Sequence, residues 1–440
     1  MTQPAGWWRR DKEGTGIWPH RGKVAITGWG QSPVDRRWDG VSMDKTLGAY
    51  AMYAAKMALD DAGLKPEDVD GLICCPDSMA GATGGSSAVW APRPYFEAPY
   101  DSEDGLTIVT GGWLQKNMPG LTNLKYNPEQ VPAIGEQMGM AAQAVAEGLC
   151  QVALVVYTAG NLQGRYRMGG ENAGDTVSGN AQWTSVYGQA GLGYTTTGVM
   201  QEYCQKYGTT WDDVLAPVVV NEHINGLMHE WSYYTLHEPY ALTIEDYKAS
   251  RFVTYPMRLF DNDRPVNAVG AFIFTTAERA KDMKQKPVYV LNHTGGGGGP
   301  LRSSAPTLVE MESWVDRAAR MGYEGSGLKP SDVDIFNPYD GYSPFLPISL
   351  ESFQWKGAKK GDAKDFFNGD ITVHGPFPHC SGGGNLGVGR TRTAMYIDGI
   401  EQLRGTAGER QVTTRAETAI CAFAPGGSAA YLYLSNDITS

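Results

Sequence analysis

One segment of this chain occurs twice, and the spacing of its two copies limits how the chain can fold. The heptapeptide LKPEDVD at residues 64–70 recurs as LKPSDVD at residues 328–334, which is 264 positions later. The same offset relates the strand-like run VAIT at 24–27 to VYVL at 288–291, and apolar residues recur at helical spacing between the two motifs in both copies. Three features in one register predict two similar halves.

Each copy is expected to form a strand, a helix and a second strand. Gly63 and Gly327 stand at the predicted helix ends, each with a proline three residues on, which is a strong stop signal. Apolar runs then begin at Gly71 and Ile335 and are typical of buried parallel strands. Further elements are predicted as helices over 141–147 and 393–403 and strands over 152–156, 270–274, 418–422 and 429–434.

These elements predict an N-terminal half over 21–160 and 251–285, an insertion over 161–250, and a C-terminal half over 286–440. The insertion is rich in aromatic residues, which suits either a cap over a flat substrate or a satellite core with subunit contacts. Both readings stay open. The aromatic residues are Trp183, Tyr187, Tyr194, Tyr203, Tyr207, Trp211, Trp231, Tyr233, Tyr234 and Tyr240.

Composition narrows the class of protein. A formal net charge of -11 with no long basic cluster argues against nucleic acid as a partner. The six cysteines form no CxxC pair, and the His and Cys residues lack a spacing typical of zinc sites, so no metal is expected in this chain. Neither a signal-like segment nor a membrane-spanning apolar run stands out, and a cytoplasmic location without a membrane anchor is expected.

Two similar halves with a large insertion in the first resemble the thiolase superfamily over about Arg21 to Asn436. The resemblance implies an α/β fold with two pseudo-symmetric halves in α/β/α/β/α layers. Thiolases carry Asn-Glu-Ala-Phe after a second-half strand, whereas this chain has Tyr339-Asp340-Gly341-Tyr342-Ser343. A tyrosine at the first position is similar to the sterol-carrier-type, lipid-transfer-type aldolases that shorten steroid side chains.

This chain departs from the thiolase pattern at three places. The segment 130–136, where the nucleophilic cysteine is expected, contains none, and residues 423–427 replace the closing Cys-x-Gly-Gly-Gly signature. The glycine-rich turn at 383–390 ends in Arg390, where thiolases have a histidine and the aldolases a second tyrosine. Retro-aldol cleavage of a β-hydroxyacyl-CoA needs no covalent intermediate. The resemblance therefore implies a carbon–carbon lyase releasing a ketone and a short acyl-CoA such as propionyl-CoA.

Five residues are candidates for catalysis. Tyr339 is the first choice for acid or base work, against a structural turn tyrosine. Arg390 cannot act as a base but could hold an enolate oxygen, a CoA phosphate or a substrate carboxylate, and a structural salt bridge is an equal alternative. Asp340 either orients Arg390 or caps the next segment, His379 is a base or a satisfied structural histidine, and Cys380 is a minor candidate for a nucleophile.

Four further residues are candidates for binding substrate: Tyr342, Cys75, Gly383 and Gly384. Cys75 is the counterpart of Tyr339 at the 264-residue offset, although a small apolar filler is the plainer reading. Tyr342 matches a packing phenylalanine of the relatives. The glycine run 295–299 lacks the end of a phosphate-binding loop and is read as a flexible loop.

The resemblance also implies partners. Apart from the CoA thioester substrate no cofactor is expected, and a homodimer through the thiolase core, working in a heterotetramer with a small OB-fold, zinc-ribbon protein, is implied, with any zinc in that partner. Two alternatives remain. One is an atypical thiolase or acyltransferase acting on an aromatic or bulky acyl-CoA through Cys75 or Cys380, and the other is a non-catalytic subunit that binds acyl-CoA or sterol.

Overall fold

A mixed sheet forms the centre of the molecule. The computed structural model describes residues 16–75, 108–128, 133–160, 192–294, 306–423 and 430–438. Among these, eight strands pair in the order β2-β3-β6-β1-β7-β10-β9-β8. Their bounds are β1 Val24–Gln31, β2 Gly71–Ile73, β3 Val152–Ala159, β6 Ala268–Thr276, β7 Val288–Thr294, β8 Ile335–Asn337, β9 Thr418–Phe423 and β10 Ala430–Ser435.

The strand order is symmetric about the contact between β1 and β7, where Ile26 pairs with Val288. β2 runs parallel to β3, and β8 runs parallel to β9, so the predicted parallel strands are confirmed. The repeated aspartates have one structural role. Asp70 accepts the backbone N–H groups of residues 151 and 152 at 2.8 and 2.9 Å, and Asp334 accepts those of residues 417 and 418 at 2.8 and 3.2 Å.

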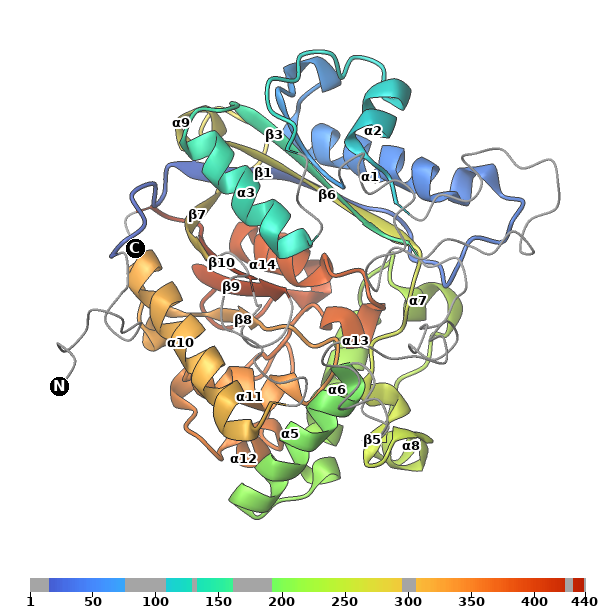
Figure 1. The fold of residues 1–440 in the computed structure, drawn as a ribbon, viewed down its shortest axis with the longest axis vertical. Coiled ribbons are helices and arrows are strands. Elements are labelled where there is room, and N and C mark those ends of the chain that lie inside the picture. The colour runs from blue at the N-terminus through green and yellow to red at the C-terminus, as the bar shows by residue number, and fades with distance from the viewer. Residues whose placement is uncertain are drawn as a thin grey trace, which may run out of the picture.

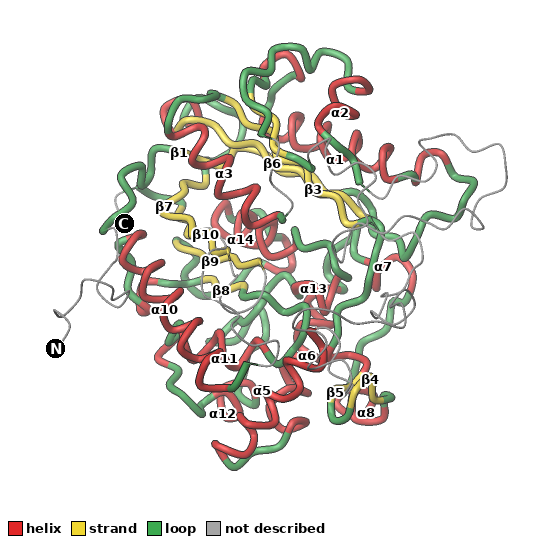
Figure 2. The backbone as a smooth tube through the Cα atoms, in the orientation of Figure 1, coloured by secondary structure: helices red, strands yellow, loops and turns green. Residues whose placement is uncertain are grey.

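Helices form three layers around the strands (Figure 1). α1 (Leu47–Ala62) covers the outer face of the first half, and α10 (Leu308–Ser326) covers that of the second. α3 (Ile134–Ala146) and α14 (Ala394–Arg404) lie between the halves, as Figure 2 also shows. Both outer helices end at a left-handed glycine, Gly63 and Gly327, as predicted. The α/β/α/β/α arrangement is confirmed.

The chain leaves the sheet after β3 and returns at β6. Within this excursion the structure describes α5 (Leu192–Tyr207), α6 (Trp211–Gly226), α7 (Tyr233–His237), α8 (Ile244–Ala249), β4 (Phe252–Thr254) and β5 (Met257–Arg258). Of its aromatic residues, Trp183, Tyr187 and the side chain of Tyr194 lie outside the described part, as do the glycine run 295–299, residues 130–132 and residues 424–427. The remaining helices are α2 (Gly111–Asn117), α9 (Ala277–Ala280), α11 (Phe345–Ser352), α12 (Ala363–Phe367) and α13 (Gly384–Val388), with 3-10 turns at Met43–Lys45, Pro66–Asp68, Leu259–Asp261, Pro330–Asp332, Trp355–Gly357 and Gly408–Arg410.

α6 joins the insertion to the second half by close backbone approach to α13. A Cβ atom added to Gly226 would lie 1.9 Å from the carbonyl oxygen of Gly387, and one added to Gly383 would lie 2.4 Å from the amide nitrogen of Gly226. Glycines therefore allow this contact. Within the described residues, no helix has the length and apolar character needed to cross a membrane.

Candidate active site

Tyr339 lies in the loop after β8, beside a second loop that leads into β6. The two loops run antiparallel: the N–H of Asp263 donates to the carbonyl of Gly341 at 3.1 Å, and the N–H of Ser343 donates to that of Asp261 at 3.0 Å. A Cβ atom on Gly341 would lie 2.1 Å from the Tyr339 hydroxyl and 2.9 Å from Asp263 Oδ2. Glycine at 341 thus lets the phenol and the carboxyl group come together.

Asp261 links the two antiparallel loops to the insertion through hydrogen bonds. Its carboxylate accepts hydrogen bonds from Trp211 Nε1 at 2.9 Å, from the Tyr247 hydroxyl at 2.7 Å and from Ser343 Oγ at 2.5 Å. These donors come from α6, from α8 and from the loop after β8. A buried carboxylate that accepts several hydrogen bonds holds its neighbours rigidly, so Asp261 positions the crossing that carries Asp263.

Asp263 is buried, with 3% of its surface exposed, and its Oδ2 atom has no hydrogen-bond partner among the described residues. Burial raises the pKa of Asp263 to about 7, although the nearby guanidinium groups of Arg390 and Arg392 act to lower it. A carboxyl group with this pKa gains and loses a proton near neutrality, which suits a general acid or base. Sequence motifs gave no signal for Asp263, because 76 residues separate it from Tyr339.

Tyr339 remains a protonated phenol at neutral pH. Burial, followed by the charge of Asp263, raises its pKa far above the usual value for tyrosine, despite the opposing effects of Arg392 and Arg390. Tyr342, which is half-buried, faces the same groups, and burial raises its pKa to about 12. Asp263, Tyr339, Tyr342, Arg390 and Arg392 therefore form one group, here named the Asp263 cluster.

Two arginines complete the Asp263 cluster. The N–H of Arg390 donates to the carbonyl of Arg264 at 2.8 Å, which joins the glycine-rich turn to the loop that carries Asp263. Arg392, which the sequence analysis missed, donates from Nη1 to the Tyr157 hydroxyl at 2.7 Å. Both side chains are 9% exposed. Buried guanidinium groups stabilise negative charge that develops beside them.

Asp340 faces a different set of groups from its neighbour Tyr339. Its carboxylate accepts hydrogen bonds from Asn385 Nδ2 and from the N–H of Leu386, both at 2.7 Å, and it lies against Gly384. Burial and the charge of Asp340 raise the pKa of Glu222 on α6 well above its usual value. Burial also raises the pKa of Asp340, which its hydrogen bonds from residues 385 and 386 oppose.

His379 and Cys380 lie in a second, fully buried group with Glu222, named here the Glu222 cluster. Burial lowers the pKa of His379 to about 3, and the ring centroids of Phe367 and Trp355 lie 5.2 and 5.8 Å from the imidazole. An imidazole with this pKa is a weak base. Burial and the charge of Glu222 raise the pKa of the Cys380 thiol, which disfavours the thiolate that a nucleophile needs.

The other predicted binding residues lie elsewhere. Cys75 follows β2 and forms a parallel bridge with Thr110, and it is half-buried. Gly383 packs against α6, and Gly384 packs against the carboxylate of Asp340. The structure thus gives both glycines a packing role beside the Asp263 and Glu222 clusters.

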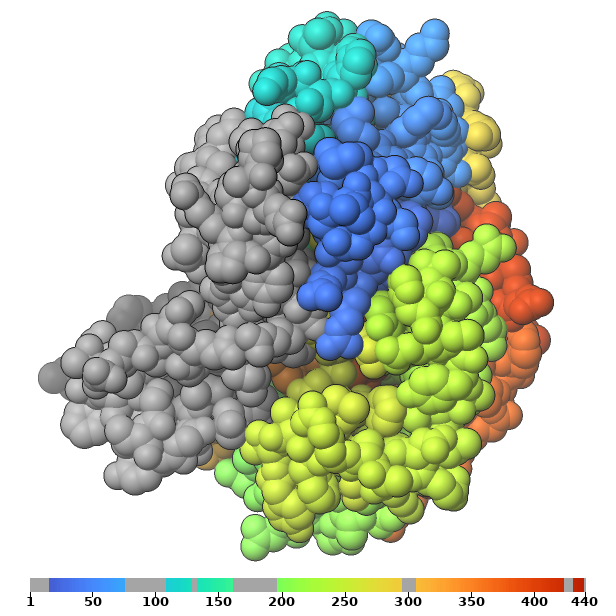
Figure 3. All heavy atoms as spheres, turned by 90° about the vertical axis from the view of Figure 1, so that its right-hand side faces the viewer, coloured from blue at the N-terminus to red at the C-terminus, as the bar shows by residue number. Residues whose placement is uncertain are grey.

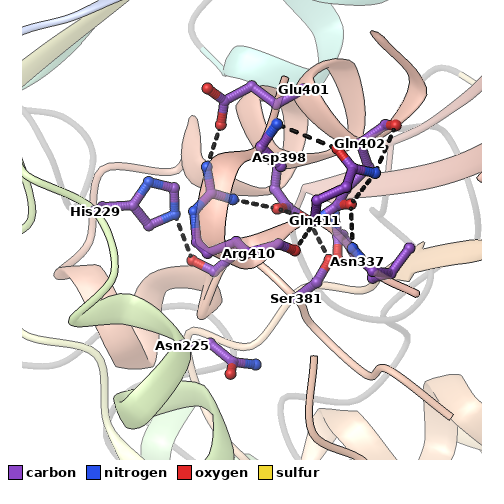
Figure 4. A network of polar contacts seen from close by, with 12 residues as sticks. Asn225, His229, Asn337, Ser381, Asp398, Glu401, Gln402, Arg410 and Gln411 are labelled. Carbon is purple, nitrogen blue, oxygen red and sulfur yellow. Dashed lines mark hydrogen bonds and ion pairs between the residues drawn. The ribbon is translucent and has the colours of Figure 1, made fainter. Parts of the chain in front are cut away.

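A network of polar side chains contacts the residues just before the glycine-rich turn (Figure 4). Arg410 pairs with Asp398 and Glu401, Asp398 accepts from Ser381 Oγ at 2.5 Å, and His229 Nε2 bonds to the carbonyl of Gly382 at 3.0 Å. Every one of these side chains except Glu401 is buried. The network holds residues 381 and 382 in place.

A hollow opens on one side of the molecule. Figure 3 shows it between atoms of the N-terminal segment, in blue, and green and yellow-green atoms of the insertion.

Comparisons with known proteins show which family this chain belongs to. A family model described as thiolase C-terminal domain-like matches residues 302–431. The 17-hydroxy-3-oxo-4-pregnene-20-carboxyl-CoA lyase of Mycobacterium tuberculosis is 30% identical over 418 residues, which cover 91% of this chain and 97% of the relative. A steroid side-chain-cleaving aldolase of Thermomonospora curvata is 27% identical, over 81% of this chain and 85% of the relative.

Solved structures agree on the fold. The structure described as the Ltp2-ChsH2(DUF35) aldolase has a TM-score of 0.74 at 21% identity, and the match covers 94% of this chain and 98% of that one. A monomeric SCP2-thiolase-like protein from Mycobacterium smegmatis has a TM-score of 0.59 at 15% identity, with 94% and 78% covered. Both matches show the thiolase fold.

Proposed function

Because the chain belongs to the thiolase-fold family that includes steroid side-chain-cleaving aldolases, we propose that it cleaves a β-hydroxyacyl-CoA with a steroid side chain by retro-aldol chemistry. The products are a ring ketone and a short acyl-CoA such as propionyl-CoA. One observation carries the proposal: a buried carboxyl group with a pKa of about 7, Asp263, lies beside the phenol of Tyr339 and two buried arginines.

The proton transfers follow from these pKa values. Ionised Asp263 removes the proton of the β-hydroxyl group. The bond between the α and β carbons then breaks, the β carbon becomes a ketone, and the electron pair forms the enolate of the thioester. Tyr339, which keeps its proton at neutral pH, donates it to the α carbon. Asp263 returns the captured proton to Tyr339, so no proton is gained or lost overall.

The arginines stabilise the charge that moves during this step. Arg390 and Arg392 already lower the pKa of Asp263, so both stand close enough to act on its charge. As the negative charge passes from the hydroxyl oxygen to the enolate oxygen, the guanidinium groups stay protonated and favour the enolate. Tyr342 lies within the same group and is proposed to contact the substrate.

Product analysis by mass spectrometry tests the proposal. Purified protein is given a 17-hydroxy steroid side-chain CoA ester, and release of the ring ketone and propionyl-CoA is measured for the natural chain, Asp263→Asn and Tyr339→Phe. We expect both variants to lose at least about 100-fold in rate, as for removal of a general acid or base. The control is Tyr323→Phe, whose hydroxyl donates to the backbone carbonyl of Phe353, away from the Asp263 cluster. Full activity of Asp263→Asn would remove this residue from the mechanism.

The assembly is a further part of the proposal. We propose a cytoplasmic homodimer through the thiolase core, joined by a small OB-fold, zinc-ribbon protein. The name of the solved aldolase that shares this fold has two components, which supports a second chain. Size-exclusion chromatography with light scattering, with and without a co-expressed partner, measures the assembly. A monomer under both conditions contradicts it.

A further inference from the structure

We propose that Glu222, His379 and Cys380 form a binding site for a divalent transition metal of the zinc class inside this chain. The site lies behind the Asp263 cluster and is independent of the proposed cleavage reaction. It combines one residue of the insertion with two residues of the second half. The sequence did not indicate it, because Glu222 lies 157 positions before His379 and the other two ligands are adjacent.

Three different metal-binding side chains converge at this point. One ligand atom from each lies within 4.8 Å of the others, and Nδ1 of His379 lies 4.0 Å from Oε1 of Glu222. Ligand atoms around a tetrahedral zinc ion lie about 3.5 Å apart. Side-chain rotations that shorten these separations by about 1 Å therefore close the shell. With both oxygens of Glu222, the site offers four donor atoms.

The polar atoms of His379 have nothing else to bind. The side chain is 0% exposed, and neither ring nitrogen has a hydrogen-bond partner among the described residues. Both side-chain oxygens of Glu222 are likewise buried, with no hydrogen-bond partner given for them among the described residues. Buried polar groups are nearly always paired, since an unpaired one costs about 1–3 kcal/mol. A bound cation satisfies both side chains together.

α6 holds the backbone of the two adjacent ligands in a fixed register. Asn221 Nδ2 donates to the carbonyl of His379 and Asn225 Nδ2 donates to that of Cys380, both at 3.1 Å. Glu222 follows Asn221 on the same helix. Cys380 has a φ of +46°, in the left-handed region that residues other than glycine rarely adopt. The framework thus presents the Cys380 side chain at a conformational cost, as ligand-binding residues often do.

The chemistry of the ligands selects the metal. A thiolate, an imidazole and a carboxylate match zinc, whereas calcium and magnesium require oxygen ligands. The charges of the Cys380 thiolate and the Glu222 carboxylate balance those of a divalent ion, so the filled site is neutral in a buried place. Binding releases the thiol proton and the carboxyl proton to solvent.

The bound metal would join the insertion to the second half. Glu222 comes from α6, and His379 pairs through its backbone with Phe336 of β8, the strand that leads to Tyr339. We therefore expect metal binding to stabilise the fold rather than to take part in proton transfer.

The test uses the full chain purified without any partner, because a zinc-ribbon protein would contribute its own metal. After incubation with zinc chloride and gel filtration, elemental analysis is expected to find about one zinc ion per chain, as one three-residue site requires. Cobalt chloride is expected to give a thiolate-to-metal charge-transfer band and visible d–d bands. Zinc content below a tenth of that value and no cobalt bands overturn the proposal.

Two cysteine variants give the matched comparison. Cys380→Ser is expected to lose the charge-transfer band and most of the zinc, whereas Cys421→Ser, at another fully buried cysteine, keeps both. Equal metal content in the two variants contradicts the assignment. Should Cys380→Ser fold poorly, competition between the wild-type chain and a chromogenic zinc chelator still measures whether one tight site exists.

The same samples separate this proposal from the proposed function. A chain that takes up no zinc on incubation but cleaves the steroid ester refutes the metal site alone. Zinc-loaded chain that shows no cleavage, even with the partner present, refutes the aldolase function alone.

Discussion

The substitution Asp263→Asn is expected to stabilise the protein above pH 7 while it abolishes cleavage. In the native state the pKa of Asp263 is about 7, against 3.8 for an ordinary aspartate. The native protein therefore keeps a proton on this group between pH 4 and pH 7 that the unfolded chain has released. The contribution of Asp263 to the stability of the native protein is complete below pH 4 and is lost as the pH rises through 7. Asparagine stays neutral throughout and removes this loss.

The size of the effect follows from the same pKa. One pKa unit corresponds to about 1.4 kcal/mol, so the raised pKa of Asp263 lowers the unfolding free energy, relative to a side chain that stays neutral, by about 2 kcal/mol at pH 5 and about 4 kcal/mol at pH 8. The asparagine variant is neutral, like the protonated aspartate, and keeps its shape. We expect the difference in unfolding free energy between variant and wild type to increase by about 2 kcal/mol between pH 5 and pH 7.5 and to level off above that.

Urea unfolding followed by tryptophan fluorescence, at intervals from pH 5 to pH 8.5, measures this difference. Taking the difference between the two proteins cancels the other buried carboxyl groups. The control is Asp261→Asn, two residues earlier, which exchanges a carboxylate that accepts hydrogen bonds from three side chains and should destabilise at every pH. A variant at Asp263 that is less stable than wild type at pH 8, or a difference that does not change with pH, refutes the reasoning.

Three more predictions concern the scaffold. Arg410→Ala leaves Asp398 buried without its cation and should cost about 3–5 kcal/mol in urea unfolding; a loss below 1 kcal/mol would contradict the network. Gly226→Ala places a methyl group 1.9 Å from a backbone oxygen of α13, so limited proteolysis should cut the insertion faster; an unchanged pattern argues against the close packing. Asp70→Ala and Asp334→Ala each leave two backbone N–H groups unpaired and should cost similar amounts, about 2–4 kcal/mol, in thermal unfolding; a large inequality would show that the two halves use the repeat differently.

The repeat predicted the fold well because its residues act locally. Gly63 and Gly327 end helices through their own backbone conformation, and Asp70 and Asp334 bond to the first residues of the neighbouring strand. Local rules of this kind can be read from one sequence. α3 was predicted too short, since it begins at Ile134 in a stretch of Gly, Gln and Met without a clear helical stripe.

The site could be predicted only where a motif carried it. Tyr339 was found from its motif, and the structure places it beside a strand end. Asp263 and Arg392 were missed because their position depends on two loops that cross far from each other in sequence. Asp340 and Glu222 likewise meet only because α6 packs on α13. Contacts of this kind depend on tertiary structure, which periodicity and propensity do not report.

The adjacent residues Tyr339 and Asp340 face two different groups of side chains. Tyr339 faces Asp263 and the arginines, where a carboxyl group near pKa 7 exchanges protons. Asp340 faces Glu222, where the side chains are wholly buried and no proton exchange with a substrate is expected. A shift of α6 therefore moves Asp340, and through the shared backbone it moves Tyr339. Because α6 also donates through Trp211 to Asp261, in the loop that carries Asp263, its position affects both partners of the proton transfer. This explains how a fold without the thiolase cysteine can position a different reaction at the same strand end.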